Sequence, residues 1–260
     1  MVKNLLGEIM VKKAKPAFDT KGLVEKIESG YITESSKPTF KTKKTFSPST
    51  LVWGSGACPR YWHLAFSGAV FAGDGGEADP KSIARMLNGT VSHERLQKAI
   101  KNAGILHSEE VKIVNNDPPI FGYCDIIVEW EGQLLPGEIK TVREEAFEYR
   151  KNSGVPAEYH LAQILFYMRE LKQDLGFVMY ESKNSHELLI LPVVMTDEYR
   201  QWLDDTYEWM RTVRSTWVDG GLAKKPYRSN SKVCKGCPLI DACKQAKVGT
   251  VSIDPLKMVQ

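Results

Sequence analysis

Two runs of β-forming residues separated by a short turn stand out in the middle of the chain. Residues 121–130 (FGYCDIIVEW) and 134–142 (LLPGEIKTV) are rich in aliphatic and aromatic side chains, and Glu131-Gly132-Gln133 lies between them. Two such segments joined by a short turn that contains glycine predict a β-hairpin.

Apolar residues recur at helical spacing in three longer segments. Residues 80–103 begin with a proline and stop before Gly104, residues 156–173 follow the hairpin, and residues 197–218 end before a Gly-Gly pair. Proline in a first turn and glycine after the last turn are typical of helix ends. The side chains expected to face the core are Leu87, Val91, Leu96 and Ile100 in the first helix, Leu161, Ile164, Leu165, Met168 and Leu171 in the second, and Tyr199, Leu203, Met210, Val213 and Trp217 in the third.

The remaining segments are shorter or less regular. Residues 176–180 and 188–191 predict a second pair of strands. Residues 1–32 contain one short helix or strand, and the pattern does not decide between them. Residues 33–50 are rich in Ser, Thr, Lys and Pro, and residues 71–79 are acidic and rich in Gly, so both are typical of loops. We therefore expect a basic extension or linker over residues 1–46, a single domain over 47–250 and a tail over 251–260.

The overall composition is that of an ordinary globular protein, with 260 residues of which 42% are hydrophobic and 26% are charged. This length is sufficient for a substantial buried core. No apolar run approaches the roughly 20 residues that a membrane span needs, and the N-terminus lacks the apolar core of a signal peptide. We expect a cytoplasmic protein with no membrane segment.

Positive charge is concentrated at the N-terminal end. The net charge is only +3, but residues 1–50 contain ten Lys against five Asp and Glu. A basic segment can follow a phosphate backbone, which makes Lys43 and Lys44 candidate DNA contacts. The alternative is a solvated tail with no partner.

The predicted hairpin brings three charged residues together. Asp125 and Glu138 face each other on neighbouring strands, and Lys140, two residues beyond Glu138, projects from the same face. Charges among apolar residues such as Ile126 and Ile139 cost free energy unless something compensates them. Mg²⁺ or Mn²⁺ does so, because these ions are held by one or two carboxylates together with phosphate oxygens. The alternative is an exposed strand face with an ordinary pair of lysine and carboxylate.

Other side chains could extend this site. His93 lies on the first predicted helix, where a neutral imidazole could be a third metal ligand, although a lone helical histidine is more often structural. Gln163 and Tyr167 are four residues apart on the second helix, so they share a face and can act together on a neighbouring strand or a bound phosphate. Arg60 and the aromatic Tyr61 beside it could contact a phosphate or a base, whereas the alternative places the aromatic residues in the core.

Three cysteines near the end of the chain, Cys234, Cys237 and Cys243, have the spacing C-x-x-C-x5-C. In an intracellular chain this spacing favours a metal site over disulfides. Cys58, far upstream, brings the number of thiolates to four, which fits a [4Fe-4S] cluster or a structural zinc. Such a site would tie the two ends of the core together. The fifth cysteine, Cys124, is expected to be a buried apolar residue.

Six motifs follow one another along residues 47–243: Cys58-Pro59-Arg60, His93, Gly122-x-x-Asp125, Glu138-Ile139-Lys140-Thr141, Gln163-x-x-x-Tyr167 and Cys234-x-x-Cys237-x5-Cys243. This ordered set resembles the RecB-like branch of the PD-(D/E)XK nucleases. Within that branch it is most similar to the iron–sulfur exonucleases, which include the CRISPR-associated RecB-type exonucleases, their phage-encoded relatives and the AddB nuclease domain. The chain departs from the pattern by placing a cysteine, and not an apolar aliphatic residue, before Asp125.

The resemblance implies a role for each matched residue. Lys140 would orient and help to activate the attacking water, while Gln163 and Tyr167 would support the site and the scissile phosphate. A [4Fe-4S] cluster would have a structural role. The implied ligands are His93, Asp125, Glu138 and the carbonyl of Ile139 for Mg²⁺ or Mn²⁺, and Cys58, Cys234, Cys237 and Cys243 for the cluster.

The resemblance also implies a fold and an activity. The fold would be α/β, with a mixed central sheet flanked by helices and an iron–sulfur subdomain formed by the N- and C-terminal segments. The activity would be that of a metal-dependent DNA exonuclease that prefers single-stranded ends, in recombination, repair, replication or CRISPR-type adaptation. Its partners would be DNA, proteins of a recombination or CRISPR-type complex and a second copy of the chain, in a host cytoplasm if the chain is phage-encoded.

Two alternatives remain open at this stage. One is a nucleic-acid-binding adaptor that has the same fold and does not cut, although the intact set of His93, Asp125, Glu138 and Lys140 argues against it. The other is an endonuclease or flap-processing enzyme that acts within a complex.

Overall fold

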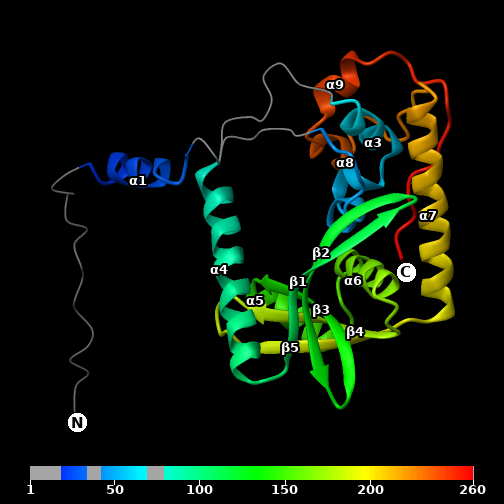
Figure 1. Cartoon of the computed structure of the whole chain (residues 1–260). Coiled ribbons are helices and arrows are strands. Elements are labelled where there is room, and N and C mark those ends of the chain that lie inside the picture. Colours follow the sequence, from blue (N-terminus) through cyan, green and yellow to red (C-terminus); the bar gives the residue numbers. More distant parts are fainter. Residues whose placement is uncertain (1–18, 34–41, 69–78, 260) are drawn as a thin grey trace, which may run out of the picture.

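The computed structural model describes residues 19–33, 42–68 and 79–259. Its centre is a five-stranded sheet in the order β1-β2-β3-β4-β5 (Figure 1). All neighbouring strands are antiparallel except β3 and β4, which are parallel. The predicted mixed sheet is therefore confirmed. The strands are β1 (Leu106–Asn116), β2 (Pro119–Trp130), β3 (Gln133–Val142), β4 (Leu175–Ser182) and β5 (Leu188–Val194).

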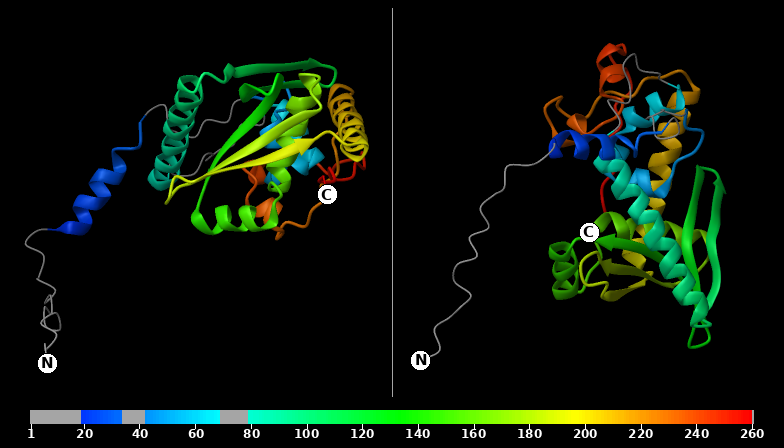
Figure 2. Two further views of the ribbon diagram at one scale, coloured as in Figure 1. Left: turned by 90° about the horizontal axis from the view of Figure 1, so that it is seen from below. Right: turned by 90° about the vertical axis from the view of Figure 1, so that its left-hand side faces the viewer.

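Helices cover both faces of this sheet. Alternate residues of β4 belong to two different hydrophobic clusters, and since alternate residues of a strand point to opposite faces, the two clusters lie on opposite sides. Helix α6 (Glu158–Glu170), which follows α5 (Glu144–Ser153) in the crossover from β3 to β4, packs on one side. Helix α4 (Pro80–Asn102) packs on the other side through Leu96 (Figure 2).

Helix α4 differs from its prediction in the half nearer the N-terminus. It begins after Asp79, whose carboxylate caps the backbone N–H groups of Lys81 and Ser82. Leu96 is buried, but Leu87 and Val91 are 51% and 61% exposed, so the expectation that they face the core is wrong. Leu87 lies about 180° and Val91 about 140° around the helix from Leu96, so both point away from the face that packs on the sheet.

The predicted hairpin and the last long helix are confirmed. Strands β2 and β3 pair through Glu131 and Gly132 at the turn, and α7 has the predicted bounds, Asp197–Val218. Strand β1 and helix α5 have no counterpart among the predicted elements. The undecided region before residue 33 contains α1 (Thr20–Ser29), a helix without buried residues.

Two segments that lie far apart in the sequence meet beside the sheet in a small lobe. The first contributes α2 (Pro48–Leu51), the 3₁₀ helix η2 (Gly54–Ala57) and α3 (Pro59–Phe66), and the second contributes α8 (Lys232–Lys235) and α9 (Ile240–Gln245) (Figure 1). Arg60 joins them by donating to the carbonyls of Ala223 and Lys247. The ordered core begins slightly before the predicted position, because Phe46 is fully buried and pairs with β2.

Parts of the sequence predictions fall outside the described residues. These parts are most of the basic extension over residues 1–46 and the acidic loop up to residue 78. Within the described ranges, no helix has the length and apolar character needed to cross a bilayer.

Candidate metal centre

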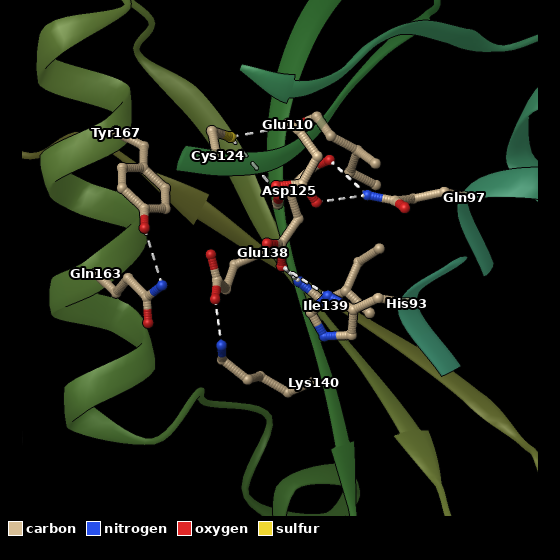
Figure 3. Close-up of polar contacts among 12 residues, drawn as sticks. His93, Gln97, Glu110, Cys124, Asp125, Glu138, Ile139, Lys140, Gln163 and Tyr167 are labelled. Atoms are coloured by element: carbon tan, nitrogen blue, oxygen red, sulfur yellow. Dashed lines mark hydrogen bonds and ion pairs between the residues drawn. The ribbon is translucent and has the colours of Figure 1, made fainter. Parts of the chain in front are cut away.

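The candidate centre lies where β2 and β3 separate. Their pairing ends at Ile126 and Gly137, so Asp125 and Glu138 are the next residues on either strand. The Asp125 carboxylate accepts a hydrogen bond from the Ile139 backbone N–H at 2.7 Å, which fixes it against β3 (Figure 3). The end of the strand pairing thus places two carboxylates side by side, as the sequence predicted.

Glu138 is fully buried and only half of its carboxylate has a partner. Its Oε1 forms an ion pair with the Lys140 ammonium, which lies on the same strand (Figure 3). Its Oε2 has no hydrogen-bond partner among the described residues. A buried carboxylate oxygen without a partner is costly, and a divalent cation is the kind of ligand that compensates it. The donor set therefore fits Mg²⁺ or Mn²⁺.

Helix α4 brings two side chains to Asp125. His93 Nδ1 lies 3.8 Å from the Asp125 carboxylate, so the histidine is in place to join the two carboxylates. Gln97, one turn later on the same helical face, donates to the Asp125 backbone carbonyl at 3.1 Å and to the Glu110 carboxylate at 3.0 Å. Neither Gln97 nor Glu110 belongs to a recognisable sequence motif, and only the fold brings them here.

The electrostatics of the centre favour the binding of a cation. Burial, and then the charge of Asp125, raise the pKa of Glu138 to about 8. Burial also raises the pKa of Asp125. Burial lowers the pKa of Lys140, but the two carboxylates outweigh it, so the net shift of this pKa is upward. Ionising both carboxylates at this buried position is therefore costly without a counter-ion, and a bound cation would offset that cost.

The stability of the metal-free protein should depend on pH through Glu138. The pKa of this carboxyl is 4.5 in a model compound and about 8 in the fold, so between these values only the unfolded chain releases the proton. Relative to Glu138→Gln, wild type should lose stability as the pH rises from 4.5 to about 8 and lose no more above that.

Thermal denaturation of both proteins in EDTA across this range measures the difference. Glu129→Gln, the same change at an exposed position of the same hairpin, should follow wild type. A difference between wild type and Glu138→Gln that stays constant with pH would contradict the burial argument.

The other two predicted residues also meet at this site. Gln163 and Tyr167 are buried on one face of α6, and the Gln163 amide donates to the Tyr167 hydroxyl at 2.9 Å (Figure 3). Burial, and then the charge of Glu138, raise the pKa of Tyr167, so the phenol keeps its proton. A neutral phenol beside the carboxylates is a hydrogen-bond donor for an anionic ligand.

No group of three or more His, Cys, Asp and Glu side chains has single-ion coordination geometry within the part of the chain that the structure describes. At the centre, the Lys140 ammonium occupies one oxygen of Glu138, and His93 is in contact with Asp125. A cation bound by Glu138 would use the unpaired Oε2 or share Oε1 with Lys140.

The four cysteines Cys58, Cys234, Cys237 and Cys243 line one cavity of about 40 Å³ in the lobe. Burial raises the pKa of Cys58 to about 11 and raises that of Cys237 as well. Cys124 is not part of this cavity, since it is fully buried in β2 with its sulfur near the carbonyls of Ile126 and Gly137. The fold thus gathers the four predicted ligands and leaves out the fifth cysteine.

The four candidate DNA contacts differ in their exposure to solvent. Arg60 and Tyr61 are 4% and 5% exposed, and the Arg60 guanidinium donates to carbonyls inside the lobe. Neither side chain is therefore on the surface, and the alternative that the aromatic residues belong to the core is confirmed. Lys43 is partly buried with its ammonium over the Trp62 ring, whereas Lys44 is exposed.

Solved structures of other proteins are similar to this chain. An alkaline exonuclease from Laribacter hongkongensis, LHK-Exo, matches with a TM-score of 0.50 and 12% identity over 72% of this chain and 95% of its own. Its complex with dAMP matches with 0.49 and 13% identity over 78% and 95%, respectively. A protein designated SSO0001 matches with 0.46 and 17% identity over 87% and 96%. No protein family and no curated protein matches the chain by sequence.

At this level of identity the likeness to LHK-Exo shows the fold alone. The chain has the α/β fold of that structure, with a mixed central sheet flanked by helices, in agreement with the fold that the sequence motifs implied.

Proposed function

We propose that the chain is a metal-dependent nuclease that hydrolyses phosphodiester bonds of DNA. The observation that carries this proposal is the buried Glu138 oxygen without a partner, set beside Asp125 and Lys140 on the fold that an alkaline exonuclease also has. A structural ion pair needs no such oxygen, and a binding module gains nothing from burying it. The finer assignment is an exonuclease that prefers single-stranded ends.

Each residue of the candidate centre would have a distinct role in the reaction. When bound, Mg²⁺ or Mn²⁺ lowers the pKa of a water molecule and stabilises the charge that develops on the phosphate. Lys140, held by Glu138, orients the attacking water. Tyr167 accepts a hydrogen bond from Gln163 and keeps its own proton to donate to a phosphate oxygen. The proposed metal ligands are His93, Asp125, Glu138 and the carbonyl of Ile139.

We further propose that Cys58, Cys234, Cys237 and Cys243 hold a [4Fe-4S] cluster with a structural role. Support comes from the four thiols that line one cavity, contributed by the two ends of the core. Zinc is the alternative for the same four ligands. A brown protein with absorbance near roughly 400 nm supports the cluster, and a colourless protein with one zinc per chain supports the alternative.

Single-stranded DNA is the proposed partner, with proteins of a recombination or CRISPR-type complex and a second copy of the chain as further proposed partners. The cytoplasm, that of the host for a phage-encoded chain, is the proposed location. Of the lysines that the sequence indicated as DNA contacts, the exposed Lys44 is the better placed.

The activity is tested with linear single-stranded DNA labelled at either end, in Mn²⁺, in Mg²⁺ and in EDTA. Wild type should shorten the DNA in either metal but not in EDTA, because the carboxylates act through the cation. Lys140→Ala should lose this activity. Lys151→Ala should keep it, because Lys151 is an exposed residue of α5 that pairs with Glu148 and Glu187. The label that persists gives the direction of digestion.

The same assay separates the alternatives. If wild type cuts circular single-stranded DNA, the protein is an endonuclease or flap-processing enzyme and not an exonuclease. If folded, metal-loaded wild type binds DNA without cutting it, the protein is the non-cleaving adaptor.

A further inference from the structure

The catalytic face of α6 extends one turn beyond the residues assigned so far. Tyr159, Gln163 and Tyr167 follow at intervals of four, so they form a row along one face of the helix. Gln163 and Tyr167 lie at the candidate centre. Tyr159 therefore stands at the border of the centre, at the N-terminal end of α6.

An exposed tryptophan lies against this tyrosine. The ring centroids of Trp53 and Tyr159 are 4.5 Å apart, with the planes at 66°. Trp53 is nevertheless 60% exposed, so Tyr159 covers only a part of the indole. A large aromatic ring that remains open to solvent next to a reaction centre has surface available for a ligand.

The backbone holds Trp53 in this place. Its N–H donates to the Thr50 carbonyl at 3.2 Å, and its own carbonyl accepts from Gly56 N–H at 2.9 Å. A Cβ at Gly56 would lie 1.7 Å from the Thr50 carbonyl oxygen, so the turn is too tight for any side chain there. Trp53 is thus presented by a short, hydrogen-bonded turn, which lowers the entropy cost of using it as a contact.

A nucleic-acid base is the ligand that this position favours. Proteins bind single strands by stacking bases on aromatic side chains, and every base offers a π face. In a duplex, neighbouring bases already cover these faces, so an exposed aromatic ring selects unpaired nucleotides. The continuous row from Trp53 through Tyr159 to Gln163 leads from this ring to the residues proposed to act on the phosphate.

We propose that Trp53, supported by Tyr159, stacks on an unpaired base close to the scissile phosphate and so provides a preference for single strands. This proposal rests on the nuclease function proposed above and names the recognition surface of that site.

The test measures binding of fluorescently labelled oligo(dT) by anisotropy in EDTA, where no cleavage occurs. Trp53→Ala should weaken binding by roughly five- to hundredfold, the range for loss of one stacked base. Trp53→Phe should retain most of the affinity. Trp130→Ala is the matched control, because Trp130 is 54% exposed at the turn of the β2–β3 hairpin, and this variant should bind like wild type.

A second set of oligonucleotides, each with one abasic nucleotide at a different position, tests which base stacks on Trp53. At one position the missing base should weaken binding to wild type as much as Trp53→Ala does. Combining that abasic oligonucleotide with Trp53→Ala should cause no further loss of affinity. Wild-type affinity of a folded Trp53→Ala variant would overturn the stacking proposal, and its continued cleavage would leave the nuclease proposal standing.

Two further results would also overturn it. Cleavage and binding of duplex ends alone would exclude the preference for unpaired bases, and a wild type that neither binds nor cuts DNA would remove both proposals. A change in oligomeric state of Trp53→Ala, without a change in DNA affinity, would instead identify the tryptophan as a contact between copies of the chain.

Discussion

Replacing Glu138 by glutamine is expected to reduce cleavage of single-stranded DNA by about a thousandfold or more, or ~4 kcal/mol of transition-state stabilisation. Glutamine keeps the size of the side chain but removes the charge that would hold the cation. It also removes the partner of the Lys140 ammonium. Affinity for Mn²⁺, measured by calorimetry, should fall together with the rate.

The fold should survive this change. Glutamine is neutral, so it avoids the cost of burying a carboxylate whose Oε2 has no partner. We therefore expect the metal-free variant to melt at the temperature of wild type or above it at neutral pH. Glu129→Gln serves as the matched control for rate and metal affinity. Cleavage by Glu138→Gln at the wild-type rate, with unchanged Mn²⁺ affinity, would remove Glu138 from the site.

Replacing Cys237 by alanine should lower the melting temperature by about 10 °C or more, which corresponds to ~3 kcal/mol for a chain of this size. The physical reason is the weak packing of the second half of the lobe. Helices α8 and α9 have four and six residues, and neither contains a buried residue. A cluster or metal bound by the four cysteines would therefore supply much of the free energy that holds these helices against α3.

Cys124→Ala is the matched control for the cysteine change. Cys124 is buried in β2 and lies outside the cavity that the other four cysteines line. Its loss should leave the iron and sulfide content intact and cost only about 1 kcal/mol for the small void. A Cys237→Ala protein with wild-type melting temperature and wild-type iron content would contradict the proposed cluster.

The sequence predicted those elements whose apolar pattern is strong. Helix α7 and the β2–β3 hairpin follow such patterns, and the charged residues of the hairpin needed no long-range information to be placed together. Strand β1 has the sequence LHSEEVKIVNN, in which Ile113 alone is buried, so its pattern is too polar to be recognised. Helix α5 likewise buries only Phe147.

The errors at single residues have physical reasons. Val91 is five residues before Leu96, which is about 140° around the helix, so it does not share the face that Leu96 packs on the sheet. Arg60 was a candidate phosphate contact because it is charged and next to aromatic residues, yet two carbonyls from the C-terminal segment satisfy it inside the lobe. Gln97 reaches the centre through contacts that only the packing of α4 creates.

The lobe combines segments from before and after the sheet, and this arrangement has a consequence for the synthesis of the protein. Cys58 leaves the ribosome 176 residues before Cys234, a delay of about 10–35 s at elongation rates of about 5–20 residues per second. Arg60 lacks both of its carbonyl partners until Ala223 is made and lacks one of them until Lys247 is made, while the intervening sheet can already fold. The first half of the lobe therefore stays incompletely packed until the C-terminal segment is synthesised. C-terminal truncation or premature release would leave the Cys58 thiol exposed and the Arg60 guanidinium without its partners, and chaperones and proteases would recognise this segment.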